Sequence, residues 1–119
     1  MAKHLEVGRL GEQKAFHFLI AKHYRILETN WRHRRAEIDL IAKDGETLVF
    51  VEVKTRSSDT FGTPDAFVTP KKRQLMQAAA NVYMEKIGHD WAIRFDIVAV
   101  LLHPTRPAEI THFEDAFFE

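Results

Sequence analysis

The feature that most constrains the fold is residues 36–54, where a turn signal joins two apolar segments. Asp44-Gly45 is a preferred dipeptide for a two-residue hairpin loop, because a type I′ turn needs positive φ at both central positions. The flanking residues 38–41 and 47–53 are rich in β-branched and apolar side chains, as strands are. This stretch therefore predicts a β-hairpin with Asp44 and Gly45 as its loop.

The register of this hairpin decides which side chains share a face, because side chains alternate along a strand. The expected cross-strand pairs are Lys43 with Glu46, Ile41 with Leu48, Asp39 with Phe50 and Glu37 with Glu52. One face then carries Glu37, Asp39, Ile41, Leu48, Phe50, Glu52, Lys54 and Arg56, and the other carries Ile38, Leu40, Val49, Val51 and Val53. Opposite and diagonal neighbours lie roughly 5 to 8 Å apart, so the carboxylates can share one cation. A one-residue slip would separate Asp39 from Glu52.

The charged end of this face has the composition of a hydrolytic metal site. Asp39 and Glu52, with Glu37 as a further candidate and the backbone carbonyl of Val53, supply hard oxygen ligands suited to Mg²⁺ or Mn²⁺. Such an ion lowers the pKa of bound water and offsets charge on a reacting phosphodiester, while Lys54 orients the water or stabilises the transition state. The alternative is that these charges line the wet face of an antiparallel sheet.

A fourth carboxylate is expected near this site from the N-terminal helix, predicted over residues 3–23. Its apolar stripe recurs at three and four residues and comprises Leu5, Gly8, Ala15, Phe16 and Leu19. Glu12 lies on the same stripe and should point towards the sheet. The alternative is a glutamate at the helix edge whose stem packs while its carboxylate reaches solvent.

A second helix begins at Thr69-Pro70, an N-cap hydroxyl followed by proline, and ends at Gly88. Its expected apolar stripe is Leu75, Ala78, Ala79, Val82 and Tyr83. Three cations occupy the first turn, where the helix dipole disfavours them unless an anion docks there. The alternative is a solvated basic face. The predicted nucleic-acid contacts are these cations and three further arginines: Lys71, Lys72, Arg73, Arg34, Arg35 and Arg56.

The remaining segments complete an α/β pattern. Residues 24–30 form a first expected strand, and 30–35 a connection that holds Trp31, interpreted as a packing residue at the sheet edge with base stacking as the alternative. Residues 57–65 form a loop that contacts substrate or acts as a flap. Residues 91–102 are nearly continuously apolar, which predicts an interior strand parallel to the Glu52 strand. Asp96 within it is interpreted as a structural hydrogen-bond or salt-bridge acceptor. Residues 110–113 form a short final strand.

Composition narrows the class of protein. The chain has 119 residues, which predicts one domain spanning 1–119, and its 17 basic and 17 acidic residues balance. It has no apolar run of membrane-spanning length and no secretory signal, so the cytoplasm is the expected compartment. Cysteine is absent, and the seven histidines lack zinc-type spacing. Disulfide, thiolate and zinc chemistry are therefore not expected.

Five motifs together resemble the YraN family of small bacterial proteins. They are Gly8-Arg9-Leu10-Gly11-Glu12, Asn30-Trp31-Arg32, Glu37-Ile38-Asp39-Leu40-Ile41, Val49-Phe50-Val51-Glu52-Val53-Lys54-Thr55-Arg56 and Arg94-Phe95-Asp96. Through this family the chain is similar to the PD-(D/E)XK nucleases and to archaeal Holliday junction resolvases. The resemblance implies a restriction-endonuclease-like αβββαβ core, a mixed sheet of about five strands flanked by helices, Mg²⁺ dependence, DNA as substrate and a homodimer. Ala36 departs from the pattern, which usually has glycine there.

Three hypotheses of function follow. The first is a metal-dependent endonuclease on branched or structured DNA, with Asp39, Glu52, Lys54 and Glu12 as catalytic residues. The second is a nucleic-acid-binding module that retains the nuclease fold without turnover. The third is a protein-interaction domain that uses the apolar C-terminal residues Phe113, Phe117 and Phe118, for which folding back onto the core is the alternative.

Overall fold

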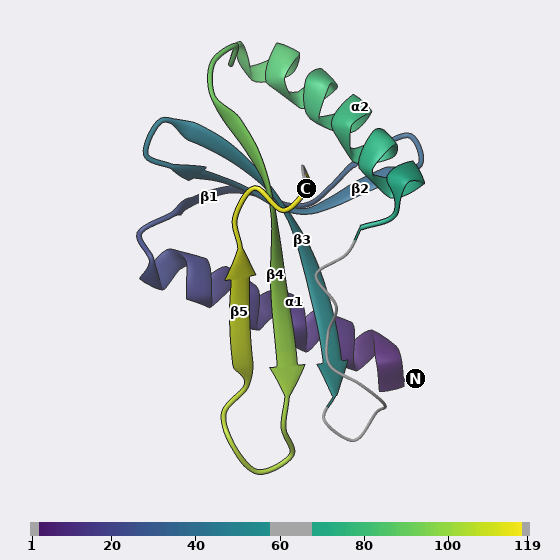
Figure 1. Cartoon of the computed structure of the whole chain (residues 1–119), viewed down its shortest axis with the longest axis vertical. Coiled ribbons are helices and arrows are strands. Elements are labelled where there is room, and N and C mark those ends of the chain that lie inside the picture. The colour runs from purple at the N-terminus through teal and green to yellow at the C-terminus, as the bar shows by residue number, and fades with distance from the viewer. Residues whose placement is uncertain (1–2, 58–67, 118–119) are drawn as a thin grey trace.

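The computed structural model describes residues 3–57 and 68–117, which form two helices and a five-stranded sheet (Figure 1). The elements in chain order are α1 (Lys3–Ala21), β1 (Arg25–His33), β2 (Ala36–Asp44), β3 (Thr47–Ser57), α2 (Pro70–Ile87), β4 (Ile93–Leu102) and β5 (Glu109–Phe113). This order confirms the expected mixed α/β fold, which is consistent with a restriction-endonuclease-like core. The strand β5 extends that core at its C-terminal end.

The sheet has the strand order β1-β2-β3-β4-β5. Strands β1, β2 and β3 pair antiparallel in succession, β3 and β4 pair in parallel, and β5 returns antiparallel to β4. The parallel pairing of residues 91–102 with the Glu52 strand is therefore confirmed. It follows from the helical connection, because a parallel pair needs a long crossover rather than a tight turn.

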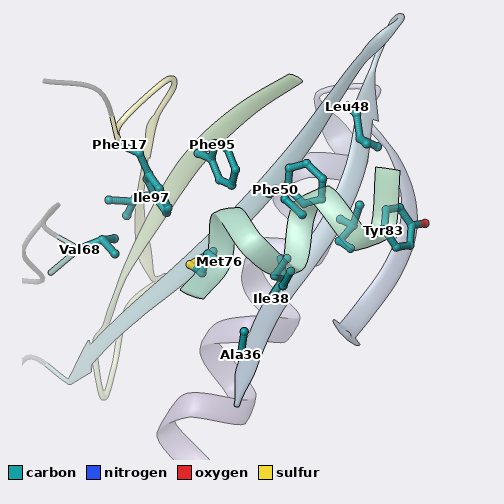
Figure 2. Close-up of a cluster of buried hydrophobic side chains, with 13 residues drawn as sticks. Ala36, Ile38, Leu48, Phe50, Val68, Met76, Tyr83, Phe95, Ile97 and Phe117 are labelled. Carbon is teal, nitrogen blue, oxygen red and sulfur yellow. The ribbon is translucent and has the colours of Figure 1, made fainter. Parts of the chain in front are cut away.

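Each face of the sheet is covered by one helix, and the two helices lie on opposite sides (Figure 1). On the α1 side, Ala15 and Leu19 pack on Leu40, Ala42, Val49, Val51, Val98 and Val100. On the α2 side, Met76, Ala79, Ala80 and Tyr83 pack on Ile38, Ile41, Leu48, Phe50, Phe95 and Ile97 (Figure 2). The central strands β3 and β4 are thus buried on both faces, as their continuous apolar runs require.

The hairpin forms, but its predicted loop is wrong by one residue. Asp44 pairs with Thr47, so the two loop residues are Gly45 and Glu46, and Gly45 takes a φ of 62°. Glycine at the first central position is the requirement of a type II′ turn. Asp44 instead stays in the strand and binds Arg94 at 3.2 Å. Moving the turn by one residue shifts each cross-strand pair by two residues, so Ile41 lies opposite Phe50 instead of Leu48. Because side chains alternate with a period of two, Ile41 keeps its predicted face.

The predicted apolar stripe of α2 is rotated relative to the observed one. Leu75 and Val82 are 36% and 37% exposed, whereas Met76 and Ala80 are buried with Ala79 and Tyr83. The small alanines let the helix approach the sheet, and the Tyr83 hydroxyl reaches Glu28 Oε2 at 3.3 Å. The predicted caps are confirmed, because Thr69 Oγ1 accepts from the Lys72 N–H and Gly88 adopts a φ of 70°.

Two further segments differ from expectation. Strand β1 runs to His33, so Trp31 lies in the strand rather than in a connection, and its ring packs edge-on against Tyr83. This agrees with a packing role for Trp31. Phe117 is 2% exposed and stacks on Phe95, so this residue folds back into the core. Phe118 and loop residues 58–65 lie outside the described part of the chain.

Candidate active site

The candidate site lies where β2 separates from β3. The register between these strands runs from Asp44 opposite Thr47 to Leu40 opposite Val51, and β2 then continues to Ala36 away from β3. Figure 2 shows both strands leaving the hairpin together and diverging, with α2 packed across them. The opening begins at Asp39 on one strand and Glu52 on the other.

Asp39 lies at a break in the alternation of β2. Ile38 and Ile41 both face α2, although strict alternation would put them on opposite faces as predicted. On β1, the facing segment between Thr29 and Trp31 holds Asn30, whose φ is 53°. Asparagine tolerates this left-handed conformation better than most residues. This break in alternation coincides with the end of the β2–β3 pairing at Leu40 and Val51. Asp39 therefore lies outside the regular hydrogen-bond ladder between these two strands.

The Asp39 carboxylate fills the gap left by this missing pairing. Its Oδ2 accepts a hydrogen bond from the Val53 N–H at 2.7 Å. In a continuous ladder, a backbone carbonyl would accept from such an N–H group. The contact holds Asp39 beside Glu52, the residue that precedes Val53, and it makes the two carboxylates neighbours as the sequence predicts.

Glu52 is buried and only partly satisfied. It is 4% exposed, and its Oε2 forms an ion pair with Nζ of Lys72 from the first turn of α2. Its Oε1 is buried without a hydrogen-bond partner among the described residues. A buried polar atom that lacks a partner is costly and calls for a ligand, an ion or water.

The pKa of Asp39 reflects its burial and the negative charges of its neighbours. Burial raises the pKa of Asp39 to about 8, and the charges of Glu52 and Glu12 act in the same direction. The hydrogen bond from the Val53 N–H and the charge of the Lys72 ammonium lower the pKa, but burial and Glu52 outweigh them. Two neighbouring carboxylates therefore disfavour the ionised form of Asp39, and a bound cation would offset this effect.

Glu12 approaches from α1, as its place on the apolar stripe predicts. It is partly buried, and its Oε1 accepts from the Asn30 amide at 3.0 Å. The helix comes close to β3 at Gly11, where an added Cβ would lie 1.9 Å from Thr55 Oγ1. Only glycine permits this approach, and it brings the next residue, Glu12, towards Asp39.

A metal ion could be held by Asp39 and Glu52 with the predicted Val53 carbonyl. No group of three histidine, aspartate or glutamate side chains in the described ranges is placed to hold one. A carboxylate pair suits Mg²⁺, which keeps several waters and accepts phosphate oxygens as ligands. The unpartnered Glu52 oxygen and the raised pKa of Asp39 both fit such an ion.

The other predicted site residues are distributed around this pair. Lys54 follows Glu52 on β3, opposite Ala99, and is partly buried. Glu37 is not brought to the pair, because its Oε1 binds Arg32 at 3.4 Å. Arg56 is exposed further along β3.

Two cavities beside α2 gather basic side chains. Arg35, Lys71 and Lys72 line one of about 280 Å³, and Arg34 and Arg35 line another of about 460 Å³ with the exposed Leu75 and Val82. Arg73 is turned away from both, because its Nη1 donates to the Phe117 carbonyl at 2.7 Å. The helix start thus presents two of its three predicted cations to a cavity.

Comparison with known proteins decides the family. The model of the uncharacterised protein family UPF0102 matches residues 11–100. The chain belongs to the UPF0102 family. It is 50% identical over 118 residues to a UPF0102 protein of Flavobacterium psychrophilum and 47% identical over 118 residues to one of Christiangramia forsetii. Both alignments cover 99% of this chain and 98% of the relative.

The expected YraN-like membership is thereby confirmed. A UPF0102 protein of Geotalea daltonii is 48% identical over 112 residues, covering 93% of this chain and 88% of that protein. No described helix is both long and apolar enough to span a membrane.

Sequence reasoning missed two polar contacts of the UPF0102 site. The sequence predicts Asn30 as the boundary between a strand and a connection, whereas it lies inside β1 and binds Glu12, and nothing in the sequence predicts the pairing of Lys72 with Glu52. A signal for Asn30 existed, since asparagine inside an otherwise apolar and charged strand often marks positive φ. Twenty residues separate Lys72 from Glu52, and no local pattern indicates that they meet.

Proposed function

We propose that this protein is a divalent-metal-dependent endonuclease that hydrolyses phosphodiester bonds in DNA. The observation that carries the proposal is the adjacent pair of Asp39 and Glu52 at the opening between β2 and β3, where Oε1 of the buried Glu52 has no partner among the described residues. The family's resemblance to PD-(D/E)XK nucleases and Holliday junction resolvases supports DNA, in branched forms, as the substrate by analogy.

The metal in this proposal is Mg²⁺ or Mn²⁺, held by Asp39, Glu52 and the Val53 carbonyl. It supplies Lewis-acid stabilisation of the phosphoryl oxygens and a more acidic bound water. The protein's own residues do the rest. Lys54 orients the attacking water, and Glu12 fixes the hydrogen bonding of Asn30 beside Asp39.

Binding of the DNA backbone falls to the cations around the opening. Arg35 and Lys71 line the cavity at the start of α2, where their side chains can contact a phosphate. Because these contacts are to phosphate, affinity should fall steeply as the salt concentration rises. A second copy of the chain would double this basic surface and suit a symmetric substrate, which is the expected homodimer.

One observation favours a second candidate, the non-catalytic binding module. The Lys72 ammonium already neutralises Glu52, so a protein cation could take the place of a metal permanently. In that case Arg34, Arg35 and Lys71 would matter for DNA affinity, and Asp39 would not.

The test is cleavage of labelled linear, forked and four-way DNA in Mg²⁺ or Mn²⁺ by wild type, Glu52→Gln and Glu85→Gln. Glu85 is exposed near the end of α2 and is the matched control. We expect cleavage by wild type and Glu85→Gln, and none by Glu52→Gln. Equal cleavage by Glu52→Gln would contradict the proposal. Salt-sensitive binding without cleavage by wild type would establish the binding module.

A further inference from the structure

The ion pair of Lys72 with Glu52 links the helix α2 to the strand β3 of the sheet. Lys72 lies in the first turn of α2, and Glu52 lies on β3. The Lys72 side chain is 45% exposed, whereas the Glu52 side chain is 5% exposed. One partner is therefore anchored in the protein, and the other is a long, flexible side chain that reaches in from the surface.

The position of Lys72 is unfavourable without a partner. A cation in the first turn of a helix opposes the helix dipole, and the first turn of α2 has no acidic residue. The backbone is nevertheless well fixed, because the Lys72 N–H donates to the Thr69 hydroxyl. The start of the helix thus holds the base of the side chain, while the ammonium depends on Glu52 for its compensating charge.

Lys72 also lines the cavity where Arg35 and Lys71 gather, and the acidic residue of this lining, Glu37, is paired with Arg32. Its ammonium pairs with Glu52, and Lys72 is at the same time part of the lining of this cavity. Rotation about its side-chain bonds can move the charge from one to the other, since lysine has four flexible methylenes. The ammonium has two available environments, one acidic and one suited to an anion.

We propose that Lys72 is an exchangeable cation that couples metal binding to nucleic-acid binding. It neutralises Glu52 until a divalent ion binds there, and the ion then displaces the ammonium into the cavity, where it contacts a phosphate of the nucleic acid. The inference rests on the proposed function. Its physical basis is that a divalent ion and an ammonium repel each other at one buried carboxylate.

The first test is calorimetric titration of Mn²⁺, without DNA, into wild type, Lys72→Met and Lys71→Met. Methionine keeps most of the length of lysine and removes the charge. Lys71→Met removes the same charge from the same turn. We expect Lys72→Met to bind Mn²⁺ about tenfold more tightly than wild type, because the ion no longer competes with an ion pair. Lys71→Met should change the affinity by less than about twofold.

The second test measures DNA binding by fluorescence anisotropy with and without Ca²⁺, on a labelled four-way DNA. In wild type, the ion should strengthen DNA binding and free Lys72 for a phosphate. In Lys72→Met, the strengthening by Ca²⁺ should be several-fold smaller. An equal strengthening in both proteins would overturn the phosphate-binding part of the inference.

The outcomes separate the inference from the proposed function. If wild type binds Mn²⁺ but Lys72→Met binds it no more tightly, the exchange is refuted and the nuclease proposal stands. If Glu52→Gln binds Mn²⁺ as well as wild type, the ion lies elsewhere and both fail. If Lys72→Met does not fold, Lys72→Arg is measured in its place. Arginine retains the charge and can bind the Glu52 carboxylate through two N–H groups of its planar guanidinium. This variant should bind Mn²⁺ no more tightly than wild type, and tighter binding would refute the exchange.

Discussion

Asp96 and Asp39 are two buried or partly buried aspartates of the same sheet with opposite electrostatic settings. Asp96 is 0% exposed and accepts from Arg94 at 2.9 Å, from His112 at 2.7 Å and from the Asp115 N–H at 2.9 Å. Burial would raise the pKa of Asp96, but these hydrogen bonds outweigh burial and hold it below its usual range. At Asp39, by contrast, burial and neighbouring acids raise the pKa to about 8.

The difference shows how a structural carboxylate is distinguished from a candidate site. The network of Asp96 includes Arg94, which also binds the Tyr24 hydroxyl at 2.7 Å. Its charge is compensated within the protein. Asp39 receives one backbone donor and faces Glu52 and Glu12. Its surroundings suit a cation that comes from outside, which favours a functional role over a structural one.

The largest expected effect is the loss of stability on Asp96→Asn. The substitution keeps the shape but removes the fully buried one of the carboxylates that compensate Arg94, whose side chain is 17% exposed. We expect the free energy of unfolding to fall by about 3 kcal/mol, measured by urea denaturation. Asp90→Asn, at an exposed position, should change it by less than about 0.5 kcal/mol. A loss below about 1 kcal/mol at Asp96 would remove the contrast with Asp39.

Asp39→Asn should have the opposite effect on stability and a large effect on activity. The folded protein disfavours ionised Asp39, so stability falls as the pH rises from the unfolded pKa towards 8. Asparagine does not ionise, and the variant should gain at least about 1.4 kcal/mol at pH 8, the value of one pKa unit. DNA cleavage should drop at least about 100-fold, or about 2.7 kcal/mol in activation free energy. Destabilisation at pH 8 would show Asp39 to be structural.

Gly11→Ala tests whether the close approach of α1 maintains the carboxylate cluster. An added Cβ would lie 1.9 Å from Thr55 Oγ1 and 2.7 Å from Thr55 Cβ, so the helix must shift. We expect a loss of about 1 to 3 kcal/mol in unfolding free energy and weaker cleavage, because Glu12 moves with the helix. Gly8→Ala is the matched control in α1, with nothing within 4 Å of its Cβ. It should stabilise by about 0.5 to 1 kcal/mol. Equal effects at both glycines would contradict this role of the contact.

The smallest expected effect is the acid dependence contributed by Asp96. A carboxyl with a lowered folded pKa stabilises the protein above its unfolded pKa, about 3.9, and loses that contribution as the pH falls through the folded pKa. Wild type should therefore lose stability below about pH 4 more steeply than Asp96→Asn. Urea denaturation between pH 5 and pH 2 measures both slopes. Parallel curves would show that the charge of Asp96 does not contribute to stability.

The elements and caps of this fold follow from local sequence. The Asp44-Gly45 turn signal and the β-branched flanks predict the hairpin, and Thr69-Pro70 and Gly88 bound α2 because their preferences act within one turn. Asp39 and Glu52 still lie close together although the predicted loop was wrong by one residue. The cross-strand pairs shift by two residues, and a shift by an even number leaves the residues of β3 on their predicted faces. The hairpin and the helix caps depend on residues that are close together in the sequence, so they can be predicted from it.

What surrounds each carboxylate was decided by tertiary structure. The buried side of α2 keeps the predicted Ala79 and Tyr83, but Met76 and Ala80 pack on the sheet in place of Leu75, Ala78 and Val82. Lys72 meets Glu52, and His112 meets Asp96, across gaps of 20 and 16 residues. The charge state of a side chain depends on such distant donors and on burial, which arise only when the chain closes on itself. Residue type and spacing indicated the acidic residues, and packing determined that Asp96 is compensated within the protein while Asp39 faces other carboxylates.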